Sequence, residues 1–96
     1  MKVREARLTD LKNLSVLFNS YRMFYGKKFD LKVAEEFLRS RIEKKDSKIF
    51  VCDFNNELSG FVQLYPLFSS TRVSKYWLLN DLYVDVNKRG KGFSKL

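Results

Sequence analysis

Three strand-like runs follow one another along this chain with no helical pattern between them. They cover Lys48 to Asp53, Leu58 to Leu67 and Ser74 to Val86. Consecutive strands joined by short polar connections pair as an antiparallel meander, whereas parallel strands need a crossover of a dozen residues or more. This order excludes a doubly wound parallel sheet and predicts an α+β fold.

A short strand and an amphipathic helix are predicted at the start of the chain. Val3 to Ala6 alternate between apolar and polar residues, as a half-buried strand does. Apolar side chains then recur at helical spacing between Asp10 and Phe24. Thr9 or Asp10 can cap the start of this helix, and Gly26 is suited to ending it. The apolar positions are Leu11, Leu14, Leu17, Phe18 and Tyr21.

A second helix is predicted after Asp30, which can act as its N-cap. One side of it is mainly apolar and the other is charged, as on a helix that packs against a core. The inward positions are Leu31, Ala34, Phe37, Leu38, Arg41 and Ile42.

The length of 96 residues limits the chain to one domain, residues 1–96, and the 45% of hydrophobic residues exclude disorder. The sequence contains no histidine, which excludes a His-based catalytic triad and most zinc sites, so no metal is expected. The single cysteine, Cys52, lies in an apolar run and is predicted to be a buried thiol. No apolar stretch approaches the ~18 residues of a membrane span, and no signal peptide is recognisable, so we expect a cytoplasmic protein without membrane contact.

The net charge is +8, from 19 Lys and Arg against 11 Asp and Glu. This balance favours an anionic ligand: a nucleic acid, an acidic lipid surface or a phosphorylated cofactor. A basic surface that only promotes solubility is the other interpretation.

A basic segment with two glycines follows the third strand-like run. The glycines allow a tight turn that brings N–H groups close to an anion, and the Arg and Lys side chains add positive charge. Taken alone, these residues fit a basic surface turn somewhat better, because short runs of glycine and basic residues are common. The segment consists of Arg89, Gly90, Lys91, Gly92, Phe93 and Ser94.

Together with the strand before it, this segment resembles the acetyl-CoA loop of the GNAT superfamily of N-acetyltransferases. That loop has Gln or Arg first, Gly fourth and Gly or Ala sixth, and this chain has Arg89, Gly92 and Ser94 there. Ser94 departs from the pattern but is small. Residues 80–84 are similar to the superfamily's fourth strand, and the order of elements matches. The resemblance implies an incomplete GNAT-like acyl-CoA N-acyltransferase fold: strand, helix, helix, then a three-stranded, mainly antiparallel meander.

The resemblance implies acetyl-CoA as cosubstrate and an amine as acceptor. The backbone of Leu82, Tyr83 and Val84 would pair with the pantetheine arm. Residues 89–94 would surround the pyrophosphate, and the acetyl carbonyl would lie at the bulged centre of the fourth strand, near Leu82.

Asp81 and Asn80 are the predicted catalytic residues. The attacking ammonium must lose a proton, and Asp81, or a water held by Asn80 and Asp81, is the basic group on this strand. Asp81 could instead bind a cationic amine, because a carboxylate attracts an ammonium. A purely structural carboxylate paired with a basic neighbour is the alternative.

The resemblance implies that the end of the first helix borders the acceptor pocket. Tyr25 is the candidate for a pocket-lining ring. Arg22 is a second candidate for substrate binding, with a solvated surface arginine as the alternative. Tyr21 and Phe24 are interpreted as core residues. The acceptor itself, a small molecule or a peptide amine, is not specified, although Asp81 favours a small cationic amine.

The resemblance covers roughly the N-terminal two thirds of such a domain, and the later strands and helices, with the expected general acid, have no counterpart. The fourth strand would then be an exposed edge rich in aromatic residues, which invites pairing with another chain. We therefore expect a homo-oligomer joined through residues 76–84.

Two alternatives remain at this stage. The chain could be an inactive remnant that folds as an oligomer and binds coenzyme A. More remotely, it could be a small basic nucleic-acid-binding module, although this leaves the strand-loop order unexplained.

Overall fold

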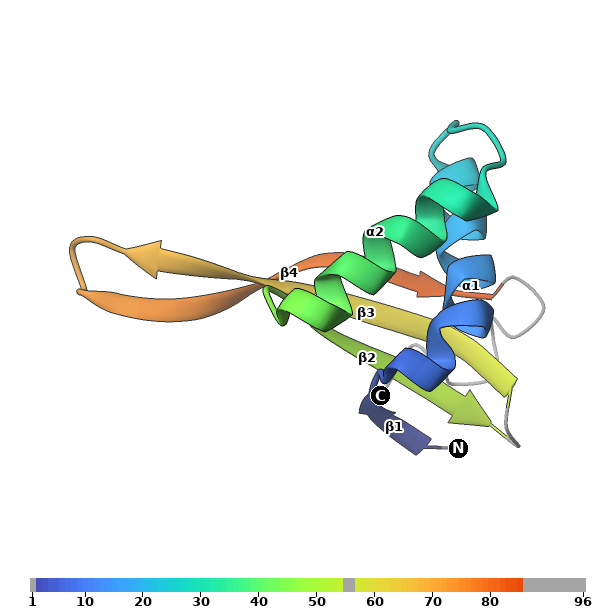
Figure 1. The fold of residues 1–96 in the computed structure, drawn as a ribbon. Helices are drawn as coiled ribbons and strands as arrows, with labels where there is room; N and C mark the ends of the chain where they lie inside the picture. The colour runs from blue at the N-terminus through green and yellow to red at the C-terminus, as the bar shows by residue number, and fades with distance from the viewer. Residues whose placement is uncertain (1, 55–56, 86–96) are drawn as a thin grey trace.

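The computed structural model describes residues 2–54 and 57–85, which form one antiparallel sheet with two α-helices on one of its faces (Figure 1). The strands lie in the order β1-β2-β3-β4, so each strand pairs with its neighbour in the chain. The predicted α+β fold with a meander is confirmed. The elements are β1 Lys2–Glu5, η1 Leu8–Asp10, α1 Leu11–Phe24, α2 Leu31–Lys44, β2 Lys48–Phe54, β3 Glu57–Ser69 and β4 Ser74–Val84.

The connection between the two helices uses the residues that the sequence indicated. Gly26 has a φ of 84°, a left-handed conformation that suits glycine, and its N–H donates to the carbonyl of Met23 at 2.9 Å. The Oδ1 atom of Asp30 accepts from the N–H of Val33 at 3.1 Å and caps α2. Each helix has 14 residues, and neither helix in the described part of the chain is long and apolar enough to cross a bilayer.

The start of α1 differs from the prediction. A turn of 3-10 helix, η1, precedes α1, and the side chain of Asp10 makes no capping bond to α1. Its carboxylate instead accepts from the N–H of Arg7 at 2.8 Å and pairs with the guanidinium of Arg4 at 2.8 Å. Arg4 also reaches Asp53 at 3.1 Å. The hydrogen bond from Arg4 lowers the pKa of Asp10 despite its burial. Asp10 therefore fastens α1 to the edge of the sheet.

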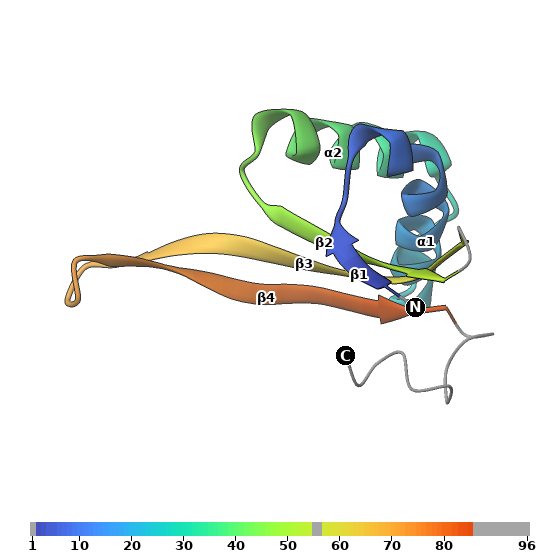
Figure 2. The same cartoon turned by 90° about the horizontal axis from the view of Figure 1, so that it is seen from below.

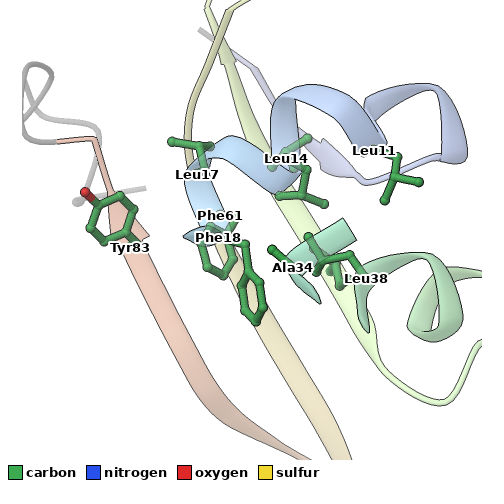
Figure 3. Packing of buried hydrophobic residues seen from close by; sticks show 10 residues of the cluster. Leu11, Leu14, Leu17, Phe18, Ala34, Leu38, Phe61 and Tyr83 are labelled. Atoms are coloured by element: carbon green, nitrogen blue, oxygen red, sulfur yellow. The ribbon is translucent and has the colours of Figure 1, made fainter. Parts of the chain in front are cut away.

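The hydrophobic core lies between the two helices and the helix-facing side of the sheet (Figures 2 and 3). The ring of Phe18 stacks on that of Phe37 at 5.5 Å and meets Phe61 edge-on at 5.8 Å. Cys52 is buried, as predicted. The buried cluster comprises Leu11, Leu14, Leu17, Phe18, Ala34, Leu38, Ile49, Val51, Phe61 and Tyr83.

The β3–β4 hairpin extends well beyond the rest of the sheet (Figure 1). The first residue of β2, Lys48, pairs with Leu64. From there to the pair Ser69 and Ser74, β3 and β4 pair only with each other among the described residues. We call residues 65–78 the arm. Several of its apolar side chains, including Phe68 and Val73, are exposed.

A β-bulge interrupts β4. Gln63 pairs with Asp81 and Leu64 pairs with Leu79, so Asn80 is the extra residue. The bulge was expected near Leu82 and lies two residues earlier. Because a bulge shifts the alternation of side chains by one residue, Leu79 and Leu82 both lie on the face away from the helices.

Candidate active site

The bulge places Asp81 on the helix-facing side of β4, directly opposite Gln63 of β3. Asp81 is only 8% exposed. Its carboxylate therefore lies under the end of α1, between the helix layer and the sheet. A charged group in this position requires hydrogen-bond donors around it.

Three donors converge on the Asp81 carboxylate. The hydroxyl of Tyr21 donates to Oδ1 at 2.7 Å, the amide of Asn80 donates to Oδ1 at 3.2 Å, and the amide of Gln63 donates to Oδ2 at 3.1 Å. A carboxylate has about four acceptor positions. These contacts leave one, on Oδ2, for a water or an ammonium group.

Gln63 is fixed from both ends. It is fully buried, and its Oε1 accepts from the hydroxyl of Ser47 at 3.1 Å while its Nε2 donates to Asp81. The carboxylate of Asp81 can only accept and therefore selects the amide orientation that presents N–H to it, while the hydroxyl of Ser47 satisfies the amide oxygen. Sequence reasoning missed Gln63 and Ser47. The sequence signal that could have identified Gln63 was a glutamine within an otherwise apolar run of β3.

Tyr21 joins the core to the site. Its ring packs edge-on against Phe61 at 5.5 Å, which confirms its interpretation as a core residue, but its hydroxyl also bonds Asp81. Burial, together with the hydrogen bond to Asp81, raises the pKa of Tyr21 above its ordinary value of 10. The hydroxyl therefore stays protonated and keeps donating at physiological pH. This contact spans 60 residues of sequence and leaves no local signal.

Tyr25 lies next to this site. It is 67% exposed, and its ring meets that of Tyr21 edge-on at 5.2 Å. Arg22 is half-buried, and its Nη1 atom has no hydrogen-bond partner among the described residues. Phe24 points outward with 63% exposure, so the prediction of a core role for Phe24 is wrong.

The predicted cofactor segment is described only in part. Arg89, Gly90, Lys91, Gly92, Phe93 and Ser94 lie outside the described residues. Directly after β4, the N–H of Asp85 donates to the carbonyl of Ser59 at 2.8 Å, so the backbone of Asp85 is directed toward β3. Backbone directions alternate along a strand, and the N–H and C=O of Leu82 therefore point away from β3. An extended ligand with amide groups can pair with such an edge.

A pocket of about 330 Å³ lies beside this edge, on the sheet face opposite the helices. It is mainly apolar, and Leu82, Tyr83 and Val84 form part of its wall with Gly60 and Leu79. In the described residues, no group of three or more Cys, Asp or Glu side chains is close enough to hold a metal ion.

Comparison with known proteins agrees with this geometry. The model of the acetyltransferase (GNAT) family matches residues 14–96. This chain belongs to the GNAT family. It is 44% identical over 92 residues to an uncharacterized N-acetyltransferase, YhfO, of Bacillus subtilis (strain 168), covering 96% of this chain and 62% of that protein. It is 34% identical over 85 residues to a probable acetyltransferase of Haemophilus influenzae, covering 88% of this chain and 58% of that protein.

Solved GNAT structures share the fold. The crystal structure of a probable acetyltransferase superposes with a TM-score of 0.92 at 37% identity, over 99% of this chain and 64% of that one. A predicted acetyltransferase from Clostridium acetobutylicum, crystallised with acetyl-CoA, superposes at 0.76 and 13% identity over 98% of this chain and 66% of that one, which shows the fold alone. The chain thus spans less than two thirds of the length of the curated relatives that it matches.

Proposed function

We propose that this protein transfers an acetyl group from acetyl-CoA to a primary amine by direct attack of the amine on the thioester. The observation that carries the proposal is the Asp81 carboxylate. It sits beside the bulge of β4, and the three donors that the described residues supply leave one acceptor position on Oδ2. Membership of the GNAT family supports the reaction class.

In this proposal Asp81 handles the proton of the acceptor. Bound acetyl-CoA supplies the acetyl group and the leaving thiolate. The open position on Oδ2 accepts a hydrogen bond from the incoming ammonium, and Asp81, or a water held by Asn80 and Asp81, takes its proton. The nitrogen lone pair then forms the new C–N bond, and the C–S bond breaks with its electron pair leaving on the thiolate. The second proton that the nitrogen must lose neutralises this thiolate. Tyr21 and Gln63 position the carboxylate for this step.

The backbone of Leu82, Tyr83 and Val84 and the loop of residues 89–94 are proposed to hold acetyl-CoA. The outward backbone groups of Leu82 and the adjoining pocket support the first part of this assignment. The loop assignment rests on its sequence pattern.

A small cationic amine is the proposed acceptor. Asp81 would attract the ammonium, and the exposed ring of Tyr25 offers a cation–π surface next to it. Arg22, whose Nη1 has no hydrogen-bond partner among the described residues, is proposed to bind an oxygen of the acceptor.

The test is thiol release from acetyl-CoA across a panel of polyamines, aminoglycosides and peptide amines. We expect Asp81→Asn to lower kcat by roughly 10²- to 10⁴-fold, the usual contribution of a general base. Glu36→Gln, which removes an exposed carboxylate from α2, is the charge-matched control and should leave kcat unchanged.

Calorimetric titration with acetyl-CoA separates the outcomes. An unaltered affinity in Asp81→Asn places the loss in the chemical step. If only KM rises, Asp81 binds the amine without acting as a base. Cofactor binding without turnover on any acceptor would overturn the catalytic proposal in favour of an inactive protein that binds coenzyme A.

Self-association through residues 76–84 remains part of the proposal. In the described residues β4 is the last strand of the sheet, and Leu78, Leu79 and Leu82 are exposed on it. Such a strand can pair with its copy. Sedimentation that gives a monomer at all concentrations would contradict this.

A further inference from the structure

A second pocket, of about 400 Å³, lies at the foot of the arm. Four elements meet there: the end of β1, the last turn of α2, the start of β2 and the start of β4. None of the residues assigned to catalysis, to acetyl-CoA or to the acceptor lines it, although Ser47, which bonds the amide of Gln63, does. Its wall consists of Glu5, Ala6, Arg41, Ile42, Lys45, Ser47, Lys48, Ile49, Lys75 and Trp77.

The pocket combines an indole ring with several cations. The Nζ atom of Lys48 lies 4.9 Å from the centre of the Trp77 ring, and that of Lys75 lies 4.8 Å from it. The two ammonium groups come from different strands and share one ring. Lys45 adds a third ammonium from the end of α2. Like charges gathered in this way repel one another unless an anion separates them.

The carboxylates nearby do not balance these cations. The Nε atom of Arg41 lies 2.8 Å from Asp46, so these two opposite charges balance each other. Within the described ranges, no ion pair involves Lys45, Lys48 or Lys75. The wall of the pocket contains these three lysines and one glutamate, Glu5, so it carries an excess of two positive charges. The C-terminal end of α2 adds only a partial negative charge, about half a unit.

We propose that this pocket binds the phosphate group of a small phosphorylated molecule. A phosphate monoester carries between one and two negative charges at neutral pH and matches the excess, whereas a carboxylate carries one. Its three terminal oxygens can accept from several lysines at once. The indole of Trp77 supplies an apolar wall for the carbon skeleton of the ligand.

This site is separate from the proposed acetyl-CoA segment. Trp77 precedes Leu82 by five residues on the same strand, which is roughly 15 Å of extended chain. The two pockets share no wall residue. The inference therefore stands or falls independently of acetyl transfer.

Trp77 is the only tryptophan in the chain, so its fluorescence reports on this pocket alone. We would titrate the full chain with inorganic phosphate and with glycerol 3-phosphate, using sodium chloride at equal ionic strength as the reference. A phosphate ion that draws Lys48 and Lys75 off the ring should give a saturable change in emission that chloride does not give. Tighter binding of glycerol 3-phosphate would show that the carbon skeleton contributes, and equal binding would assign the site to phosphate alone.

Variants assign the effect to the pocket. Lys48→Gln and Lys75→Gln should each raise the midpoint for phosphate by about tenfold, since each removes one charge-assisted contact. Lys32→Gln removes an equal charge from the exposed side of α2 and should leave the midpoint unchanged. Circular dichroism checks that all three variants are folded. The proposal is overturned by a signal that chloride reproduces, or by three variants with the same midpoint as the parent chain.

Discussion

The strands β3 and β4 pass through two different environments. At one end their helix-facing side chains are covered by α1 and α2 and carry the Asp81 network. In the arm the same two strands pair only with each other among the described residues. A two-stranded ribbon is at best marginally stable by itself. The arm therefore depends on the covered end, whereas the covered end does not depend on the arm.

Two phenylalanines of β3 show that position decides this difference. Phe61 is 3% exposed and Phe68 is 78% exposed, although the two are identical in chemistry and seven residues apart. The first lies beneath α1 and the second lies beyond the last pair that β3 forms with β2.

The largest expected effect compares these two positions. Phe61→Ala should lower the free energy of unfolding by about 3–5 kcal/mol, because it leaves a cavity under α1. Phe68→Ala should change it by less than about 0.5 kcal/mol. Urea unfolding followed by circular dichroism measures both. Similar losses in the two variants would show that the arm is buried in solution, for example against a second copy.

The next effect concerns the contact between β3 and β4 at the covered end. A Cβ atom at Gly60 would lie 2.8 Å from the carbonyl oxygen of Tyr83, a backbone atom that cannot move aside cheaply. We expect Gly60→Ala to destabilise the protein by about 1–3 kcal/mol and to lower acetyl transfer, because β4 is displaced beside Leu82.

Gly26→Ala is the comparison for this variant. A Cβ there meets nothing within 4 Å, but the φ of 84° is unfavourable for alanine. It should cost about 1 kcal/mol and leave the rate of the folded protein unchanged. Equal losses of rate in both variants would contradict a specific effect at β4.

A smaller effect is the pH dependence of the bond that fastens α1 to β1. The hydrogen bond from Arg4 lowers the pKa of Asp10 below its ordinary 3.8. The contribution of Asp10 to the free energy of unfolding is therefore complete above about pH 5. It is lost as the pH falls through the lowered pKa. Urea unfolding at several acidic pH values should show a shallower loss of stability in Asp10→Asn than in the parent. Glu36→Gln should keep the parent slope.

The smallest effect is expected at the tip of the arm. Val73 has a φ of 51°, a conformation that a β-branched residue rarely adopts. Val73→Gly should relieve this strain, although glycine loses more backbone entropy on folding and this offsets part of the gain. The net effect should stabilise the hairpin by up to about 1 kcal/mol. Hydrogen exchange should slow in the arm amides and stay unchanged around Phe61. Faster exchange in the arm would show that the valine side chain stabilises the turn.

The sequence predicted those structural features whose cause lies within a few residues of the chain. Gly26 and Asp30 act within one turn of a helix, and the strand order follows from short connections, so both could be predicted. The role of Asp10 could not, because its partner Arg4 lies on β1 and is shared with Asp53 of β2. The outward position of Phe24 was missed because helical spacing alone does not say where α2 covers α1.

The candidate site was predictable only in its central residue. Asp81 could be predicted because it is a carboxylate in a strand rich in aromatic residues and because the strand resembles the fourth strand of the GNAT superfamily. Its partners Tyr21 and Gln63 reach it from α1 and β3, 60 and 18 residues away in the chain. The bulge at Asn80 is a slip of one residue between paired strands, which no single strand encodes.

The buried amide of Gln63 has a consequence for the path of protons. A carboxamide neither gains nor loses a proton near neutral pH, so the chain from Ser47 through Gln63 to Asp81 orients dipoles without conducting charge. Tyr21, with its raised pKa, resists deprotonation on the other side. The interior is thus insulated from the carboxylate. In the proposed reaction, a proton that Asp81 takes from an acceptor therefore cannot pass inward through Gln63 or Tyr21 and must leave toward solvent.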